Sequence, residues 1–329
     1  MLLDRHDAIL SDLDGVVYAG PHAIEGAPQA LNAAQDSGVP VAFVTNNAGR
    51  SVTAVAEHLV ELGVATDADH VISSAQAAAK LLAERCAPGT KVLITGAPAL
   101  ADCVAEAGLV PVYSQQDEPA AVVQGFNPEI GWAQLAEASY TLADPEVLWV
   151  ASNTDLTIPK ERGLAPGNGT LVGAVAQACG RTPIVAGKPE SPIFHTAAQQ
   201  LNSEKPLVIG DRLDTDILGA NRANMASALV LTGVEDFSSV AAAEVQQRPT
   251  YIIETLAGIF EEYPKIVIRT EGSMVRAEGA GWNVEVEDGA VRAAGGGTEI
   301  DLWRVASQAW WAAHPHADHP VPMPEIIRD

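Results

Sequence analysis

Short apolar runs alternate with longer amphipathic segments along most of the chain. The apolar runs have the length and content of buried strands, and they are Ala8–Ser11, Val39–Val44, Val71–Ile72, Val92–Thr95, Ala121–Gln124, Val147–Ala151, Leu207–Ile209 and Ala228–Leu231. The alanine-rich segments between them have helical spacing, and they are Ala27–Ser37, Val52–Leu62, Ala75–Glu84, Gly131–Ala138, Thr170–Ala178, Ile193–Leu201 and Thr215–Ala223. This alternation predicts an α/β fold with largely parallel sheets.

The pattern changes after about residue 263. Short alternating runs predict antiparallel strands at Lys265–Arg269, Asn283–Val286 and Gly289–Arg292, and Asp301–Ala313 is typical of an amphipathic helix. We therefore expect a small α+β extension. Its tryptophans are expected to pack within the chain or to drive self-association, and they are Trp303, Trp310 and Trp311. A proline-rich stretch with three histidines follows, and we expect these side chains to be solvated: His314, His316 and His319.

Composition fits a folded protein of roughly two domains, because 47% of the 329 residues are hydrophobic and 19% are charged. The apolar stretches fall short of the roughly 20 residues that span a bilayer. The first residues include acids and lack a long apolar core, so we expect no signal peptide and a cytoplasmic protein. The cysteines lack C-x-x-C spacing and predict reduced, mostly buried thiols: Cys86, Cys103 and Cys179.

The net charge of −23 argues against nucleic acid and anionic membranes as partners, because their phosphates would be repelled at long range. A small phosphorylated ligand remains compatible with this charge. Such a ligand needs only local compensation from a metal ion or a few cations. We therefore expect a small phosphorylated metabolite as the partner.

Polar side chains gather where the predicted strands end or helices begin. The four groups are Asp12 with Asp14, Thr45-Asn46-Asn47, Gly187-Lys188-Pro189 and Gly210–Asp216. Ligands of open α/β sheets bind at the carboxyl ends of the strands. Carboxylates are suitable ligands for Mg²⁺, which prefers oxygen, and a lysine with hydroxyl and amide groups can face a phosphate.

These four groups, DLDGVVY, TNN, GKP and GDRLDTDI, resemble the four signature motifs of the haloacid dehalogenase superfamily of phosphohydrolases. The sequence is most similar to the p-nitrophenyl-phosphatase-like branch, over about residues 5 to 262. The resemblance implies a doubly wound, Rossmann-like core at 1–80 and 181–262, with an inserted α/β cap at 81–180. Residues 263–329 form the C-terminal extension, which resembles the partial acetyltransferase-like fragment of some actinobacterial relatives.

The resemblance also implies a role for each motif. Asp12 is the nucleophile and Asp14 the acid/base; Mg²⁺ is held by Asp12, the Asp14 carbonyl and Asp211, with support from Asp216. Phosphate-binding positions are implied for Gly15, Thr45, Asn46, Asn47 and Lys188. In the cap, Asn153 and Asp155 match an N-x-D element, and Ile158 is a further candidate for substrate contact. A capping or Asx-turn role for Asn153 and Asp155 stays open at this point.

The spacing of Asp12 and Asp14 has a chemical rationale of its own. Residues two apart on an extended segment point to the same side, so one carboxylate can attack while its neighbour delivers a proton. A nearby cation would offset the repulsion between them. Taken alone, D-x-D-G is also typical of a turn, TNN of a helix cap and GKP of a solvated loop. The ordered coincidence of all four favours the functional interpretation.

We therefore expect a Mg²⁺-dependent phosphomonoester hydrolase that acts through an aspartyl phosphate. An enclosing cap favours a compact substrate, and the actinobacterial relatives that the chain resembles act on glycerol 3-phosphate. The alternatives are 2-phosphoglycolate, a broad sugar-phosphate or p-nitrophenyl phosphatase, a phosphomutase, and a non-catalytic receiver-like phosphate-binding module. Assembly into a homo-oligomer through the cap or the extension is left open.

Overall fold

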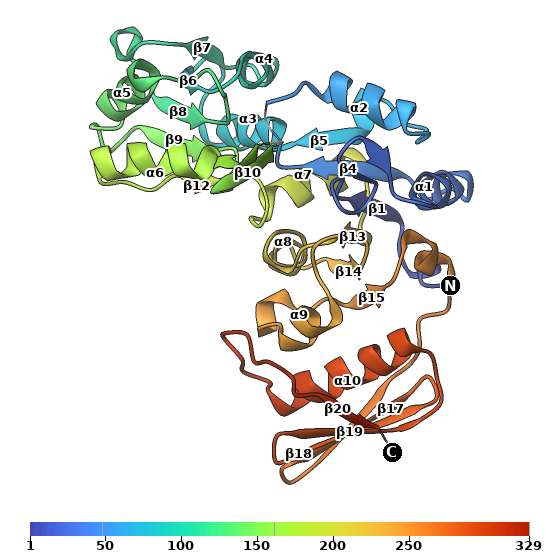
Figure 1. Ribbon diagram of the computed structural model, residues 1–329. Helices are drawn as coiled ribbons and strands as arrows, with labels where there is room; N and C mark the ends of the chain where they lie inside the picture. The colour runs from blue at the N-terminus through green and yellow to red at the C-terminus, as the bar shows by residue number, and fades with distance from the viewer. Residues whose placement is uncertain (48, 161, 329) are drawn as a thin grey trace. The chain divides into compact units, whose positions relative to one another are not determined.

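The computed structural model describes residues 1–47, 49–160 and 162–328, and these divide into two compact units (Figure 1). The first unit comprises Met1–Val41, Leu62–Val64 and Leu201–Asp329, and the second comprises Ala42–Glu61 and Ala65–Gln200. In the described ranges, no helix has both the length and the apolar character that crossing a membrane requires.

The first unit contains four parallel strands in the order β15-β14-β13-β1. They are β1 (Ala8–Ser11), β13 (Pro206–Gly210), β14 (Ala226–Val230) and β15 (Tyr251–Ile253). All residues of β1 and β13 are buried, which agrees with their almost entirely apolar sequences. The α-helices and short strands that accompany this sheet are α1 (Ala27–Asp36), α8 (Leu218–Arg222), α9 (Phe237–Ala242), β2 (Tyr18–Ala19) and β3 (His22–Ala23), and short helical turns join them.

The second unit contains the parallel pair β4 (Val41–Thr45) and β5 (Val71–Ser73), and a five-stranded parallel sheet in the order β12-β9-β8-β6-β7. The strands of that sheet are β6 (Lys91–Thr95), β7 (Val110–Val112), β8 (Ala121–Gln124), β9 (Leu148–Ala151) and β12 (Ile184–Val185). A small antiparallel hairpin is formed by β10 (Thr157–Lys160) and β11 (Gly163–Pro166). The helices are α2 (Val52–Glu61), α3 (Ser74–Arg85), α4 (Pro98–Glu106), α5 (Trp132–Thr141), α6 (Asn168–Cys179) and α7 (Pro192–Gln200).

The C-terminal extension is a twisted sheet covered by one helix, α10 (Glu299–Ala313) (Figure 1). Its strands are β16 (Val267–Glu271), β17 (Met274–Gly279), β18 (Trp282–Glu287), β19 (Ala290–Gly295) and β20 (Ile326–Arg328). Neighbouring strands are antiparallel except β20, which runs parallel to β19. The α/β fold class and the α+β extension are thus confirmed.

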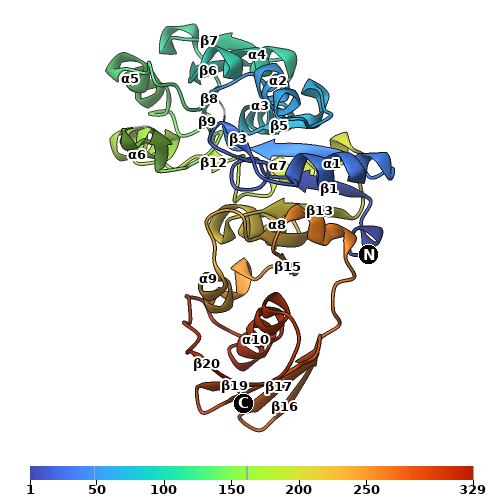
Figure 2. The same ribbon diagram turned by 45° about the vertical axis from the view of Figure 1, so that its right-hand side comes forward.

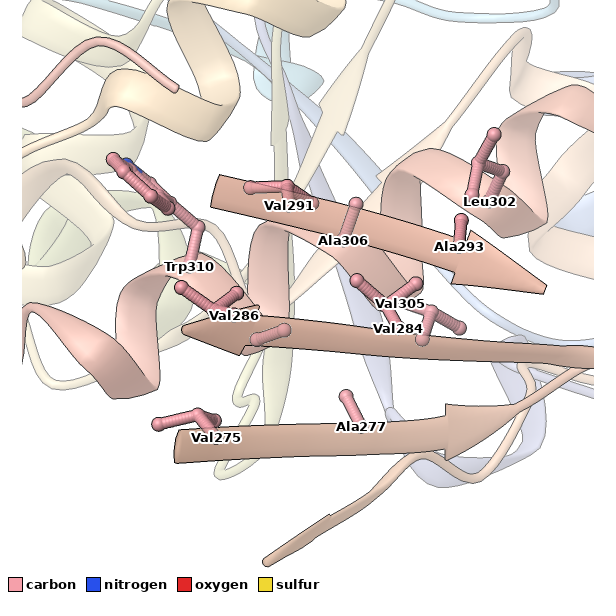
Figure 3. Packing of buried hydrophobic residues seen from close by; sticks show 11 residues of the cluster. Val275, Ala277, Val284, Val286, Val291, Ala293, Leu302, Val305, Ala306 and Trp310 are labelled. Atoms are coloured by element: carbon pink, nitrogen blue, oxygen red, sulfur yellow. The ribbon is translucent and has the colours of Figure 1, made fainter. Parts of the chain in front are cut away.

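Helix α10 buries two faces. One face packs on the sheet, where Leu302, Val305 and Trp310 meet the inward side chains of β17, β18 and β19 (Figure 3). The other face places Trp311 in a cluster with residues of the parallel-sheet region, including Leu229 and Ile252. The helix also contacts α9, beside which it lies in Figure 2.

The tryptophans of α10 therefore pack inside the chain. Trp310 and Trp311 are buried, and Trp303 stacks on Phe237 with ring centroids 5.1 Å apart. The expected solvation of the histidines is wrong for His314, which is half-buried and lies against Trp310, while His316 and His319 are exposed.

The three cysteines are free thiols, as expected. All three are partly buried, and none is fully enclosed in the core. They lie near helix ends or on a helix flank, where the apolar pattern alone does not distinguish full from partial burial.

Candidate functional site

Three carboxylates come together at the carboxyl ends of two neighbouring strands of the first unit. Asp12 follows β1, and Asp211 and Asp216 follow β13. Oxygen atoms from the three side chains all lie within 4.8 Å of one another. Because β1 and β13 are parallel and paired, their carboxyl ends meet at one sheet edge, as the sequence analysis expected.

Two of these carboxylates, those of Asp211 and Asp216, are buried and accept hydrogen bonds from the backbone. Asp211 and Asp216 are only 2% and 1% exposed. The backbone N–H of Val234 donates to Asp211 Oδ2 at 3.0 Å, and the backbone N–H of Arg212 donates to Asp216 Oδ2 at 3.2 Å. Burial of acidic groups is costly without such partners, so their position is built into the fold.

Glycines line these two carboxylates closely. A Cβ added to Gly15 or Gly233 would lie 2.2 or 2.0 Å from Asp211 Oδ2, and one added to Gly210 would lie 2.1 Å from the Cβ of Asp216. Real Cβ contacts are never this short, so only glycine fits at these positions. The resemblance implied Gly15 as a phosphate-binding position, but this packing role and the role of Gly233 were not predicted from the sequence.

Asp216 lies on a wide helical turn, Leu213–Ile217, that leads into α8. Such π-type turns occur often at functional sites. Asp214, in the same turn, points elsewhere: it is exposed and pairs with Arg212 at 2.8 Å. This hydrogen bond with Asp214 raises the pKa of Arg212. Asp214 therefore lies outside the carboxylate cluster, although it is close in sequence to Asp211 and Asp216.

Asp14 lies in the tight loop that follows β1. The N–H of Gly15 donates to the Tyr18 carbonyl at 2.9 Å, and Thr232 Oγ1 donates to the Gly15 carbonyl at 2.7 Å. Asp14 is exposed whereas Asp12 is half-buried, so the two carboxylates have different environments. Different environments are what a nucleophile and an acid/base require.

The donor set of the cluster fits a hard divalent cation. Carboxylate oxygens are the ligands that Mg²⁺ prefers, and it usually takes them together with water and substrate phosphate oxygens. At Gly15, Gly210 and Gly233 there is no side chain to press on the two buried carboxylates. We conclude that Asp12, Asp211 and Asp216 are suited to hold Mg²⁺.

The polar residues of the second and third motifs gather in the second unit around Asn46. Thr45 is buried at the end of β4, and its Oγ1 accepts from the N–H of Asn47 at 3.1 Å. Lys188 is 4% exposed, and its N–H donates to Asn46 Oδ1 at 2.8 Å. Asn47 is exposed, and its Oδ1 accepts from Gly49 at 2.9 Å.

Two of the three cap candidates belong to this same group. Asn153 Nδ2 donates to the Asn46 carbonyl at 2.7 Å, and the Asp155 carboxylate accepts from Asn46 Nδ2 at 3.1 and 3.2 Å. Asn153 Oδ1 also accepts from the N–H of Asp155 at 3.2 Å, which is the Asx turn that the sequence analysis left open. Ile158 lies half-buried on β10.

Two members of this group were not found from the sequence. Ser74 Oγ donates to the Asn46 carbonyl at 2.8 Å, and Asn168 Nδ2 donates to the Asn153 carbonyl at 2.7 Å. Both residues open a helix, where a polar side chain is ordinarily interpreted as a cap. Their long-range partners leave no local signal.

Two family models and a curated relative match this chain. A family model described as haloacid dehalogenase-like hydrolase matches residues 9–110, and one described as HAD-hydrolase-like matches residues 185–259. The D-glycerol 3-phosphate phosphatase of Mycobacterium tuberculosis is 41% identical over 98% of this chain and 90% of its own length.

Solved structures give the same relationship. The glycerol phosphate phosphatase of Mycobacterium tuberculosis in complex with magnesium is 40% identical with a TM-score of 0.86, covering 99% of this chain and 94% of that chain. The p-nitrophenyl phosphatase of Archaeoglobus fulgidus is 28% identical with a TM-score of 0.70, covering 76% of this chain and 97% of that chain. The similarity to the mycobacterial structure therefore includes the C-terminal extension.

Proposed function

Since the chain belongs to the haloacid dehalogenase-like hydrolase family, we propose that it is a Mg²⁺-dependent phosphomonoester hydrolase whose substrate is glycerol 3-phosphate. The carboxylate cluster of Asp12, Asp211 and Asp216 is the observation that carries the chemistry. The resemblance drawn from the four motifs is confirmed at the level of the family.

In the proposed reaction, Asp12 attacks phosphorus and a bond forms between its carboxylate oxygen and the phosphoryl group. The bond from phosphorus to the glycerol oxygen breaks, and Asp14 gives its proton to the departing alkoxide. Water then attacks the aspartyl phosphate while Asp14 takes up a proton. The Asp12–phosphorus bond breaks, and phosphate leaves.

Mg²⁺, when bound, would neutralise the charge that develops on the phosphoryl oxygens. Asp211 and Asp216 would hold it with Asp12, and the Asp14 carbonyl is the further ligand implied by the family pattern. Gly15, Thr45, Asn47 and Lys188 stay predicted phosphate-binding positions; the resemblance also implied Asn46, but its side chain is engaged by Lys188 and Asp155. Lys188 would supply positive charge, which phosphoryl transfer needs because its transition state spreads negative charge over several oxygens.

The substrate proposal is supported by the mycobacterial relative, which is named for glycerol 3-phosphate and matches nearly the whole chain. Several expectations from the sequence stay predictions. They are the domain limits at 1–80, 81–180, 181–262 and 263–329, the cap contacts of Asn153, Asp155 and Ile158, the cytoplasmic location and a homo-oligomer. A cap over the site would exclude macromolecular substrates and favour a compact phosphomonoester.

The test is a free-phosphate assay on the purified protein with Mg²⁺. The panel contains glycerol 3-phosphate, 2-phosphoglycolate, sugar phosphates, nucleoside monophosphates and p-nitrophenyl phosphate. We expect the highest kcat/KM for glycerol 3-phosphate. A higher value for another member would overturn the substrate, whereas absence of phosphate release from every member would overturn the hydrolase and favour a phosphate-binding module.

A further inference from the structure

Both ends of the Asn46 side chain are engaged by protein groups. Its Oδ1 accepts from the N–H of Lys188 at 2.8 Å, while its Nδ2 lies 3.0 Å from the Lys188 carbonyl oxygen and 3.1 and 3.2 Å from the Asp155 carboxylate oxygens. The orientation of the amide is fixed by these partners. The Lys188 N–H requires the amide oxygen as its acceptor, and the Lys188 carbonyl and the Asp155 carboxylate require the NH₂ group as their donor.

A side-chain amide carries two N–H donors, and here both are directed at Lys188 and Asp155. The amide therefore has no donor left for a phosphoryl oxygen. We propose that Asn46 is a positioning residue, whose side chain fixes the Lys188 backbone and the Asp155 carboxylate relative to each other. This inference rests on the proposed function, because it assigns Asn46 a role within the same site.

The backbone of Asn46 is fastened as well. Its carbonyl accepts from Ser74 Oγ at 2.8 Å and from Asn153 Nδ2 at 2.7 Å. Gly187 lies so close that a Cβ there would meet Asn46 Oδ1 at 2.6 Å and the Ser152 carbonyl oxygen at 2.4 Å. The glycine before Lys188 thus permits the close approach on which the Asn46–Lys188 pair depends.

The result is one residue that joins four segments of the second unit. These are the end of β4, the start of α3, the loop containing Asn153 and Asp155, and the loop containing Lys188. Lysine has a long flexible stem, so its charge is placed well only when its backbone is held. Preorganised charge is what stabilises a phosphoryl-transfer transition state, and a small displacement lowers that benefit.

The alternative is that the Asn46 side chain binds the phosphoryl group directly. The two roles differ in how mutations combine. If Asn46 acts through Asp155 and Lys188, either Asn46→Ala or Asp155→Ala disrupts the same set of hydrogen bonds. The effects of the two substitutions on kcat/KM then do not multiply. A direct ligand would act independently of Asp155, and the effects would multiply.

The experiment measures kcat/KM for both single variants and for the double variant, with p-nitrophenyl phosphate and glycerol 3-phosphate. Amide hydrogen exchange of the peptide containing Lys188 is measured on the same proteins. We expect each single variant to lose on the order of 10- to 100-fold in kcat/KM, the double variant to lose about the same, and the Lys188 amide to exchange faster in Asn46→Ala. Multiplying effects with unchanged exchange would overturn the proposal.

A matched pair of milder variants covers the case in which Asn46→Ala does not fold. In Asn153→Asp the donor to the Asn46 carbonyl is lost while the Asx turn is kept. Asn127 has the same pattern, but its partners are the Gly96 carbonyl, to which it donates at 3.2 Å, and the N–H of Glu129, from which it accepts at 2.9 Å. We expect Asn153→Asp to speed exchange at Lys188 and to lower kcat/KM, and Asn127→Asp to do neither. Equal effects of both would contradict the inference.

Different measurements would contradict the proposed hydrolase activity and the proposed positioning role of Asn46. If the wild-type protein releases no phosphate from either substrate, the proposed hydrolase is wrong. The exchange measurement needs no turnover, so it still decides whether Asn46 holds the Lys188 backbone.

Discussion

A side chain at position 15 and the carboxylate of Asp211 exclude each other. The backbone of Gly15 has φ of +79°, and a Cβ built on it would lie 2.2 Å from Asp211 Oδ2. Gly15 belongs to the loop after β1, and Asp211 follows β13, so this contact joins the first and fourth sequence motifs. The position of Asp211, a candidate metal ligand, therefore depends on glycine at position 15.

The first prediction compares two glycines with positive φ. Gly15→Ala displaces Asp211 in addition to straining the backbone, so we expect kcat/KM to fall at least about 100-fold and Mg²⁺ affinity to weaken. Gly20 has φ of +59° and nothing within 4 Å of its built Cβ, so Gly20→Ala introduces only strain. We expect that control to lose about 1–2 kcal/mol of stability with activity unchanged. Steady-state kinetics and urea unfolding measure both; equal kinetics in the two variants would refute the role of the contact.

The second prediction concerns the cation. Adding Mg²⁺ should raise the Tm of the wild-type protein, because an ion that binds only the folded state stabilises it, and chelation should suppress phosphate release reversibly. Asp211→Asn should abolish the Mg²⁺-dependent shift. Asp214→Asn is the matched control, since Asp214 stands in the same motif but is exposed and paired with Arg212. A shift that survives in Asp211→Asn would place the cation elsewhere.

The third prediction separates the two half-reactions. In Asp14→Asn the proton acceptor for hydrolysis of the intermediate is lost, and we expect kcat to fall about 100- to 10,000-fold. With p-nitrophenyl phosphate the departing group needs little protonation, so phosphorylated Asp12 should accumulate after a burst of nitrophenol release. Asp12→Asn should give no burst. Rapid-mixing kinetics and mass spectrometry of the quenched protein test this, and turnover of Asp14→Asn at the wild-type rate would exclude the assignment.

Local pattern was sufficient where a strand is buried throughout. The predicted bounds of β1 and β8 match the structure, because both are short apolar runs that end at polar or glycine residues. Helix α4 and strand β20 were not predicted. Helix α4 begins at Pro98, two residues after Gly96, and such a glycine and proline are equally typical of a loop. Strand β20 pairs with β19 across a gap of about thirty residues.

In the site, too, some features could be predicted from local sequence and others depend on long-range contacts. The approach of Asp12 to Asp211 followed from one rule about the ends of parallel strands, so the sequence was enough to predict it. The contacts of Asn46 could not be predicted, because each of them depends on which loop the fold brings to the amide. The sequence indicated Asn153 and Asp155 but left open whether they form an Asx turn or contact substrate; the structure shows the Asx turn and hydrogen bonds of both residues with Asn46, and substrate contact stays a prediction.

The fourth prediction concerns the reactivity of Cys103. Burial, assisted by Glu106 and Asp102, raises the pKa of this thiol to about 11 from its ordinary value of 9.0. The thiolate is the reactive form, so near neutral pH the folded protein should be alkylated at Cys103 roughly 100-fold more slowly than the unfolded chain. The rate should then rise with pH up to about 11. Iodoacetamide labelling followed by peptide mass spectrometry measures this, and fast labelling of the folded protein at neutral pH would contradict it.

The fifth prediction concerns Arg304, which ties α10 to the parallel sheet. Its side chain is 7% exposed; Nε donates to the Ile252 carbonyl at 2.9 Å, Nη1 donates to Asp301 at 2.9 Å, and the guanidinium lies 4.8 Å from the Tyr263 ring centre. Arg304→Ala leaves a buried carbonyl and a mostly buried carboxylate without this donor, and we expect a loss of about 2–3 kcal/mol in the free energy of unfolding.

The matched control for Arg304 is an arginine whose ion pair is exposed. Arg276 pairs with Glu285 at 2.8 Å across β17 and β18, and both side chains are more than 40% exposed. Because water solvates such a pair well, Arg276→Ala should cost about 0.5 kcal/mol or less. Urea unfolding compares the two variants, and limited proteolysis shows whether Arg304→Ala releases residues beyond 263 before the rest of the chain. If both arginines cost equally little, the buried contacts of Arg304 do not anchor the extension, and the burial of Trp311 beside Ile252 must do so alone.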